Sequence, residues 1–246
     1  YASVYMLGLG LKDSQIGLIA SISLALQVFW ALVSGALTDK YGRKRTTFYS
    51  DFFSWTVPCV IWAVAQDFNY FLVAVIFNSA WRISHTSWTC IVVEDTDPEQ
   101  LMDVYTWIYI AGLLAAFFAP LAGLLIAKYT LIPTVRGLYV LAAIMMTAKF
   151  VVMNAMVTEP RRGQIRMEET RNQSLLSLLG EYKGVFRQLL GTPETLYTIG
   201  IMLVMGIVNT ITSNFWSILV TRNLLIPEEH LAIFPVARSI VMLGFF

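Results

Sequence analysis

A series of long apolar runs limits what this chain can fold into. Runs begin at Ile16, Phe48, Tyr70, Val104, Gly137 and Leu196. Each approaches or exceeds the roughly 20 residues that a helix needs to cross a bilayer. Strands are a poor alternative, because the sequence lacks alternating segments of about ten residues and lipid offers no partner to an open backbone. The chain is 57% hydrophobic and 13% charged, whereas a soluble domain carries about 25% charged residues. We therefore predict an all-α integral membrane protein, folded as a transmembrane helix bundle.

The segment Gly35–Arg45, which reads GALTDKYGRKR, separates the run that ends near Leu37 from the run that begins at Phe48. Its charged residues are Asp39, Lys40, Arg43, Lys44 and Arg45. A loop this short requires a tight helical hairpin. Short loops rich in Lys and Arg stay on the cytoplasmic side, so we expect this end of the hairpin in the cytoplasm.

The loop also matches a longer pattern, Gly-x-x-x-Asp-(Arg/Lys)-x-Gly-Arg-(Arg/Lys)-(Arg/Lys). The matching residues are Gly35, Asp39, Lys40, Gly42, Arg43, Lys44 and Arg45. The pattern resembles the signature that the major facilitator superfamily carries between its second and third helices. An ordinary positive loop would explain the cations but not Gly35, Asp39 and Gly42.

The resemblance implies two six-helix halves. On this basis residues 1–157 form the N-terminal six-helix bundle, 158–193 a cytoplasmic linker and 194–246 the start of the C-terminal bundle. About eight spans are expected, with the first and last truncated. The linker segment Ser174–Leu190 has apolar residues at three- and four-residue steps opposite polar ones, which predicts an amphipathic helix on the inner leaflet.

Loop charge gives the orientation. The predicted cytoplasmic loops are residues 38–47, 94–103 and 158–193, and the predicted external turns include 128–136. Loop cations concentrate in the cytoplasmic set, while the external segments hold only Lys12, Lys128, Arg136 and Arg222. This distribution predicts a multi-pass protein of the cell membrane.

Polar residues inside the spans are candidates for a solute site, because ionisable groups at bilayer depth are costly and usually functional. The fourth span places Asn78, Arg82, His85 and Thr86 on one helical face, with Arg82 near its middle. The resemblance implies that spans 1, 4, 7 and 10 line a central cavity. This adds Tyr5, Asn209, Ser213 and Trp216. The alternative is that such groups only hold helices together, as Ser, Thr and Asn often do.

Two ion pairs are expected. In the family the loop arginine pairs with an acid near the end of span 4, which here predicts Arg43 with Glu94 or Asp95. This pair would act as a cytoplasmic latch, near water and worth about 1 kcal/mol, with Asp39 facing the second half. Within the spans, Asp51 and Lys149 are expected to form a structural pair between spans 3 and 6.

The function implied by the resemblance is secondary active transport of a small solute by alternating access, coupled to an ion gradient. A central arginine favours an anionic or polar solute, and a proton is the candidate coupling ion. Membrane lipid is the other expected partner. A net charge near zero gives no nucleic-acid footprint, and isolated His and Cys residues predict neither a metal nor a cofactor. Antiport is not supported, because Ala116–Gly123 lacks the glycines of the antiporter motif.

Two other classes remain open. One is a non-transporting receptor or sensor built on a carrier fold. The other is a membrane-embedded enzyme, which would need a clustered catalytic set. We find no paired carboxylates and no His/Asp grouping in the predicted spans, so we expect no enzymatic activity.

Overall fold

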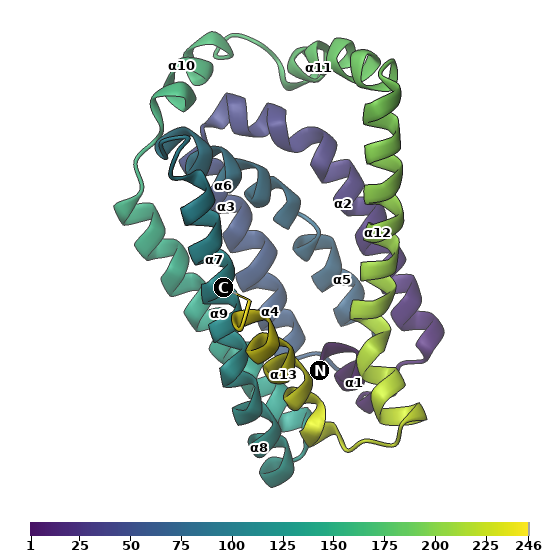
Figure 1. The fold of residues 1–246 in the computed structure, drawn as a ribbon. Coiled ribbons are helices and arrows are strands. Elements are labelled where there is room, and N and C mark those ends of the chain that lie inside the picture. Colours follow the sequence, from purple (N-terminus) through teal and green to yellow (C-terminus); the bar gives the residue numbers. More distant parts are fainter. Residues whose placement is uncertain (246) are drawn as a thin grey trace.

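Figure 1 shows a bundle of helices that run up and down beside one another. The computed structural model describes residues 1–245, and for 181–183 and 185–189 it describes the helix but not the side chains. Every regular element in this range is helical. In chain order they are α1 (Ala2–Gly8), α2 (Asp13–Tyr41), α3 (Arg43–Asp51), η1 (Phe52–Thr56), α4 (Val57–Ala63), α5 (Phe68–Asn78), α6 (Trp81–Asp95), α7 (Leu101–Ala115), η2 (Ala116–Phe118), α8 (Ala119–Tyr129), α9 (Leu131–Met156), α10 (Arg161–Glu169), α11 (Leu175–Leu190), α12 (Pro193–Ile218), η3 (Leu219–Asn223), η4 (Glu228–Ala232) and α13 (Ile233–Leu243).

Four continuous helices among the described residues are long and apolar enough to cross a membrane: Asp13–Tyr41, Leu101–Tyr129, Leu131–Met156 and Pro193–Asn223. The remaining apolar helices run alongside these four in the same bundle (Figure 1). Large apolar side chains such as Val28, Ile144 and Val152 are exposed on the outside. In a bilayer such side chains face lipid, whose tails are as apolar as they are. The all-α membrane bundle predicted from the sequence is therefore confirmed.

The third span runs from α3 through η1 to α4, and its irregular turn lies next to Pro58. Residues Phe52–Thr56 form a π-helical turn, in which the Val57 N–H donates to the Phe52 carbonyl. Proline has no N–H for the carbonyl four residues before it, and its ring crowds that carbonyl. The irregularity expected at Pro58 is therefore present, as a wider helical turn in the residues just before it.

The fourth span differs from the continuous run predicted over Tyr70–Val93. It is broken into α5 and α6 at Ser79 and Ala80. The Ser79 hydroxyl donates to the Ile76 carbonyl at 2.7 Å, and the Ala80 N–H donates to the Phe77 carbonyl at 3.1 Å. Such local bonds compete with the regular ladder and bend the helix.

The predicted external turn at 128–136 is much shorter in the structure. Thr130, with φ of 70°, is the single residue between α8 and α9. Arg136 consequently lies inside α9 and not in a loop. Its Nη2 donates to the Ala65 carbonyl at 2.7 Å, and its Nε donates to the Tyr5 hydroxyl at 3.3 Å. This arginine thus joins α9 to the ends of α4 and α1.

The two ends of the bundle are built differently. A hydrophobic cluster at one end includes Val4, Ile16, Phe71, Leu131 and Val220. The linker helices α10 and α11 lie across the opposite end, where α2 ends and α3 begins (Figure 1). The predicted amphipathic pattern of α11 rests on side chains outside the described part of the chain: Glu181, Tyr182, Lys183, Phe186, Arg187, Gln188 and Leu189.

Candidate functional site

The loop between α2 and α3 is a single residue, Gly42, with φ of 87°. Side chains rarely adopt this backbone conformation, so glycine is required for the tight reversal. A Cβ at Gly42 would also lie 2.6 Å from the Met167 sulfur and 2.9 Å from Glu159 Oε2. The glycine predicted from the loop pattern therefore has two roles, the turn itself and space for the linker.

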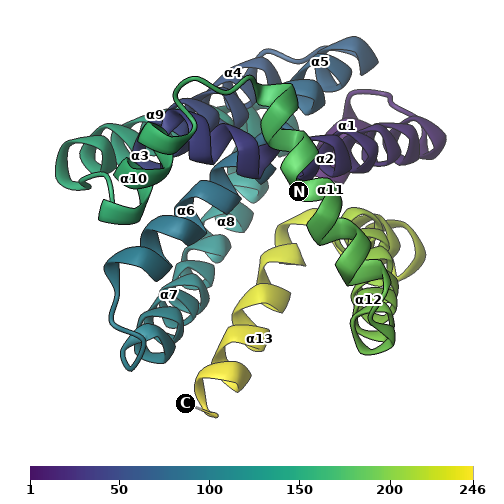
Figure 2. The same ribbon diagram turned by 90° about the horizontal axis from the view of Figure 1, so that it is seen from above.

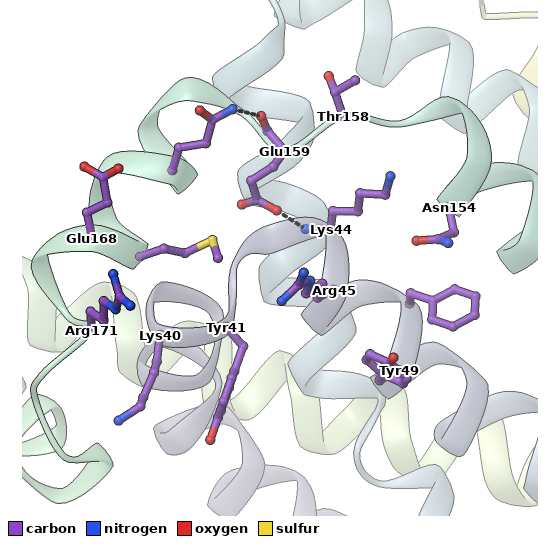
Figure 3. Close-up of a pocket in the computed structure, with 13 residues that line it drawn as sticks. Lys40, Tyr41, Lys44, Arg45, Tyr49, Asn154, Thr158, Glu159, Glu168 and Arg171 are labelled. Atoms are coloured by element: carbon purple, nitrogen blue, oxygen red, sulfur yellow. Dashed lines mark hydrogen bonds between the residues drawn. The ribbon is translucent and has the colours of Figure 1, made fainter.

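The Glu159 carboxylate caps the start of α3, which the sequence analysis did not predict. Its Oε1 accepts from the Arg43 N–H at 2.6 Å, and its Oε2 accepts from the Lys44 N–H at 2.8 Å (Figure 3). These N–H groups have no partner within their own helix, and the positive end of the helix dipole favours an anion there. A Cβ at Gly163 would overlap the same carboxylate. The linker is therefore fitted closely against the loop.

Arg43 is buried at the centre of this end of the bundle, with only 3% of its surface exposed. Its Nη1 lies 3.1 Å from Asp39 Oδ1. Its Nη2 and Nε both lie 3.2 Å from the Glu94 carboxylate, in the two-pronged geometry that guanidinium favours. The predicted pair with Glu94 is present, whereas Asp95 is exposed. The expectation that this pair lies near water is wrong, because the linker and α6 cover it.

Asp39 also contacts the linker. Arg166 from α10 donates to Asp39 Oδ2 at 3.0 Å, and the Thr170 hydroxyl donates to the Asp39 carbonyl at 3.2 Å. Hydrogen bonds donated to Glu169 and to Asp39 raise the pKa of Arg166 above its usual value. The sequence analysis expected Asp39 to face the second half. Its described partners lie instead in α3 and α10.

The other cations of the loop have separate surroundings. Lys40 donates through Nζ to the Gln173 carbonyl, which adds another contact between α2 and the linker. Lys44 and Arg45 line a cavity beside α10 (Figure 3). Gly35 lies in α2, half-buried, nearly two turns before Asp39. Arg43 is thus the member of the pattern that joins α2, α3 and α6 by ion pairs.

Arg82 lies in α6 beside α2. Its Nε donates to Gln27 Oε1 at 3.3 Å, and its guanidinium carbon lies 4.3 Å from the centre of the Trp81 ring. No carboxylate of the described residues lies within ion-pair distance of it, as expected from the sequence. His85 is exposed one turn further on, edge-on to Trp81. Arg82 and His85 thus share one open side of α6.

Three of the predicted cavity residues contact neighbouring helices. The Asn78 amide donates to the Ser54 carbonyl of η1 at 2.8 Å, and the Thr86 hydroxyl lies 3.0 Å from the Ser34 hydroxyl of α2. Tyr5 is fully buried, and its hydroxyl donates to the Trp62 carbonyl at 3.0 Å. Tyr5 therefore does not line a solute cavity. For Asn78 and Thr86 these contacts favour the helix-packing alternative.

The predicted residues of span 7 lie on α12 and are exposed: Asn209, Ser213 and Trp216. The Ser213 hydroxyl donates to the Thr210 carbonyl of its own helix at 3.2 Å. Trp216 packs edge-on against Phe234, with 5.7 Å between ring centres. Figure 2 shows α12 and α13 on the opposite side of the bundle from α9 and α10. No contact joins Arg82 or His85 to these α12 residues within the described part of the chain.

The first and second groups of helices meet at the end away from the loop. Arg222 donates to Asp13 at 2.9 Å, and the Ser3 hydroxyl donates to the Asn214 carbonyl at 2.5 Å. A Cβ at Gly123 in α8 would overlap the carbonyl oxygen of Glu229 in η4. Small residues allow such close backbone approach between membrane helices. Gly123 is therefore a packing residue at the junction of the two groups.

Asp51 and Lys149 form the ion pair predicted between spans 3 and 6, with 3.4 Å between Nζ and Oδ2. Asp51 is almost buried, whereas the Lys149 side chain is 53% exposed and passes over the Phe150 ring. This pair lies away from α12, as a structural role requires.

A comparison with protein families agrees with the loop pattern and the helix arrangement. The family model described as Major Facilitator Superfamily matches residues 1–246. No curated protein and no solved structure matches the chain. The loop signature, the helical membrane bundle and the family match over the whole sequence lead to one conclusion: the chain belongs to the Major Facilitator Superfamily and is a multi-pass membrane protein of a transporter family.

Proposed function

We propose that this protein carries a small anionic or polar solute across the cell membrane by alternating access, driven by a proton gradient. In this scheme residues 1–157 and residues from 194 onward are the two moving bundles, and residues 158–193 connect them on the cytoplasmic side. The protein is a carrier and not an enzyme. Membership of the superfamily supports membrane transport in general, and the contacts described above support the finer proposal.

The observation that carries the proposal is the buried charge network around Arg43. A single guanidinium contacts Asp39 and Glu94, and Asp39 in turn contacts Arg166 of the linker. Opening the cytoplasmic end would separate α2 from α6 or from the linker and break one of these pairs. Ion pairs with two alternative arrangements are a suitable latch for a balanced two-state equilibrium.

The opposite end is closed in a different way. Gly123 brings the η4 backbone against α8, and Arg222 and Asp13 pair across the same end. We therefore assign the described arrangement to a state whose external end is closed. Arg82 and His85 on α6, together with Asn209, Ser213 and Trp216 on α12, are the candidate solute contacts. Arg82 has no described counter-charge, so its guanidinium is available to an anionic group of the solute.

The proposal is tested in sealed vesicles that contain the purified protein and a trapped pH-sensitive dye. A panel of carboxylates, phosphate esters and polyols is added outside, with and without an imposed proton gradient. We expect one solute class to change the internal pH and to accumulate only when the gradient is present. Accumulation that ignores the gradient contradicts coupling. Solute binding without uptake favours a receptor, and chemical conversion of the solute favours an enzyme.

The latch is tested with Arg43→Lys and Arg43→Ala. Removing one partner of a buried ion pair is typically destabilising by about 3–5 kcal/mol, so Arg43→Ala should also reduce stability. Arg43→Lys keeps the charge but loses the two-pronged contact with Glu94, and it should slow transport in protein that is still folded. Lys149→Gln, which removes a cation from the peripheral pair, is the matched control. Equal transport in Arg43→Lys and the wild type would contradict the latch.

A further inference from the structure

A cavity of about 950 Å³ lies beside the loop, where α2, α3 and α9 approach α10. It is distinct from the candidate solute contacts, since Figure 2 shows α9 and α10 on the side of the bundle away from α12. Its polar lining comes from the loop and from the linker, and includes Lys44, Arg45 and Arg171 (Figure 3). The transport mechanism proposed above makes no use of this cavity.

The cavity has an excess of positive charge. Neither Lys44, Arg45 nor Arg171 forms an ion pair with a carboxylate of the described residues. Two acids also line the cavity, but Glu159 already accepts hydrogen bonds from two backbone N–H groups of α3. Only Glu168 is left to offset the three cations. Clustered cations of this kind attract the anionic headgroups of a membrane surface.

The lining changes from charged to apolar toward the membrane. A second cavity of about 480 Å³ shares Tyr41, Arg45 and Tyr49 with the first and is otherwise lined largely by apolar atoms, including those of Leu37. Tyr41 and Tyr49 are 49% and 60% exposed. Tyrosine rings are enriched where a protein crosses the membrane–water interface. A charged cavity that continues into an apolar groove suits a phospholipid better than a soluble anion.

We propose that this cavity binds the headgroup of an anionic phospholipid from the leaflet at the loop end of the bundle. Lys44, Arg45 and Arg171 contact the phosphate, and an acyl chain follows the groove past Tyr41 and Tyr49. A lipid bound here holds α10 against α3. It therefore stabilises the linker contacts of Glu159 and Arg166 that cover Arg43. This inference goes beyond transport, because it does not depend on which solute is carried or on how carriage is coupled.

The test is the melting temperature of the purified protein in detergent, titrated with dioleoylphosphatidylglycerol. A ligand that binds only the folded state raises stability with the logarithm of its concentration. We expect a rise with phosphatidylglycerol, none with dioleoylphosphatidylcholine and none with glycerol 3-phosphate. Each cation near a membrane surface contributes about a fivefold factor to binding. The double variant Lys44→Gln/Arg45→Gln should therefore need roughly 25 times more phosphatidylglycerol for the same rise.

The matched control is Arg161→Gln/Arg162→Gln, which removes two exposed cations from the start of α10 without touching the cavity lining. It should respond like the wild type. An equal loss in both double variants would mean that general surface charge explains the effect, and would overturn the site. An equal rise with glycerol 3-phosphate would overturn the lipid as occupant. If Lys44→Gln/Arg45→Gln does not fold, Arg171→Gln alone should still need about five times more phosphatidylglycerol.

Discussion

Single residues in this protein often satisfy a backbone group of another helix. Pro58 is the clearest case. Because it has no N–H, the carbonyl of Ser54, four residues earlier, lacks its usual partner. The Asn78 amide of α5 donates to this carbonyl at 2.8 Å. In lipid an unsatisfied carbonyl is costly, and a side chain from a neighbouring helix is a known remedy. Asn78 thus belongs to the packing of spans 3 and 4.

This assignment predicts an interaction between two mutations. Asn78→Ala should lower the free energy of unfolding by about 1–3 kcal/mol, since it leaves a buried carbonyl unpaired. In a Pro58→Ala background the helix recovers its own N–H, so the same mutation should cost less. Reversible unfolding in mixed micelles of all four proteins measures the coupling. Strictly additive effects would show that Asn78 acts elsewhere.

Arg82 gives the second prediction at this scale. Its described contacts are the Gln27 amide and the Trp81 ring, and both leave part of the guanidinium available. Arg82→Lys should keep the charge and the fold but weaken solute binding by about tenfold or more, because lysine cannot form the planar two-pronged contact. Arg82→Ala should abolish transport. Uptake and solute affinity in vesicles are the measurements.

A matched variant separates recognition from packing at Arg82. Gln27→Leu removes the partner in α2 and leaves the guanidinium in place. If Arg82 contacts the solute, Gln27→Leu should transport better than Arg82→Lys. The reverse order, or degradation of both Arg82 variants in cells, would assign this arginine to helix packing.

At the scale of elements, the junction of α8 and η4 depends on the absence of a side chain at Gly123. Gly123→Val would force η4 away from α8, at a cost of about 1–3 kcal/mol typical of overpacking. The external end should then open more often. Ala232→Cys, placed at a buried position beside Gly123, reports the opening by its reaction with an impermeant maleimide. In a background without Cys59 and Cys90, Gly123→Val should speed this reaction about tenfold.

Gly112 provides the control for this experiment. It lies in α7 of the same span, and nothing would lie within 4 Å of a Cβ added there. Gly112→Val should therefore leave the labelling rate of Ala232→Cys unchanged. Equal acceleration by both substitutions would mean that valine in this span loosens the bundle in general, and the specific role of Gly123 would be rejected.

The elements also show what the sequence could and could not predict. Apolar runs and the loop pattern were enough to predict the hairpin, the Gly42 reversal and the Arg43–Glu94 pair, because each is set by local spacing or by the family pattern. The shared face of Asn78 and Arg82 was not correct. Helical periodicity assumes a continuous helix, and the break at Ser79 and Ala80 places the two residues in separate helices.

Contacts between distant segments were the main omission. The Glu159 carboxylate reaches an N–H 116 residues earlier in the chain, and no periodicity relates two positions so far apart. The only local signal was an acid directly before Pro160 and Arg161, at the start of the linker. Tyr5 was misplaced for a similar reason, because helical spacing gives a face but not the neighbour that covers it.

At the scale of the whole molecule, the structure divides the connecting segments between two ends. The α2–α3 turn, the end of α6, and the helices α10 and α11 lie at one end, while α1, the α8–α9 turn and η4 lie at the other (Figure 1). Lys and Arg are concentrated at the first end, and segments with many cations resist transfer across the membrane. We therefore expect the first end in the cytoplasm and the second outside.

Single cysteines in a background without Cys59 and Cys90 test this orientation. Asn69→Cys and Glu168→Cys place exposed thiols at the two ends. An impermeant maleimide added to intact cells should label Asn69→Cys at once, and Glu168→Cys only after the membrane is permeabilised. Both substitutions leave the Arg43 network untouched, so unfolding should not confuse the result. Labelling of Glu168→Cys in intact cells would reverse the orientation. The Arg43 latch would then lie outside, and the cavity beside Lys44 and Arg45 would face the outer leaflet.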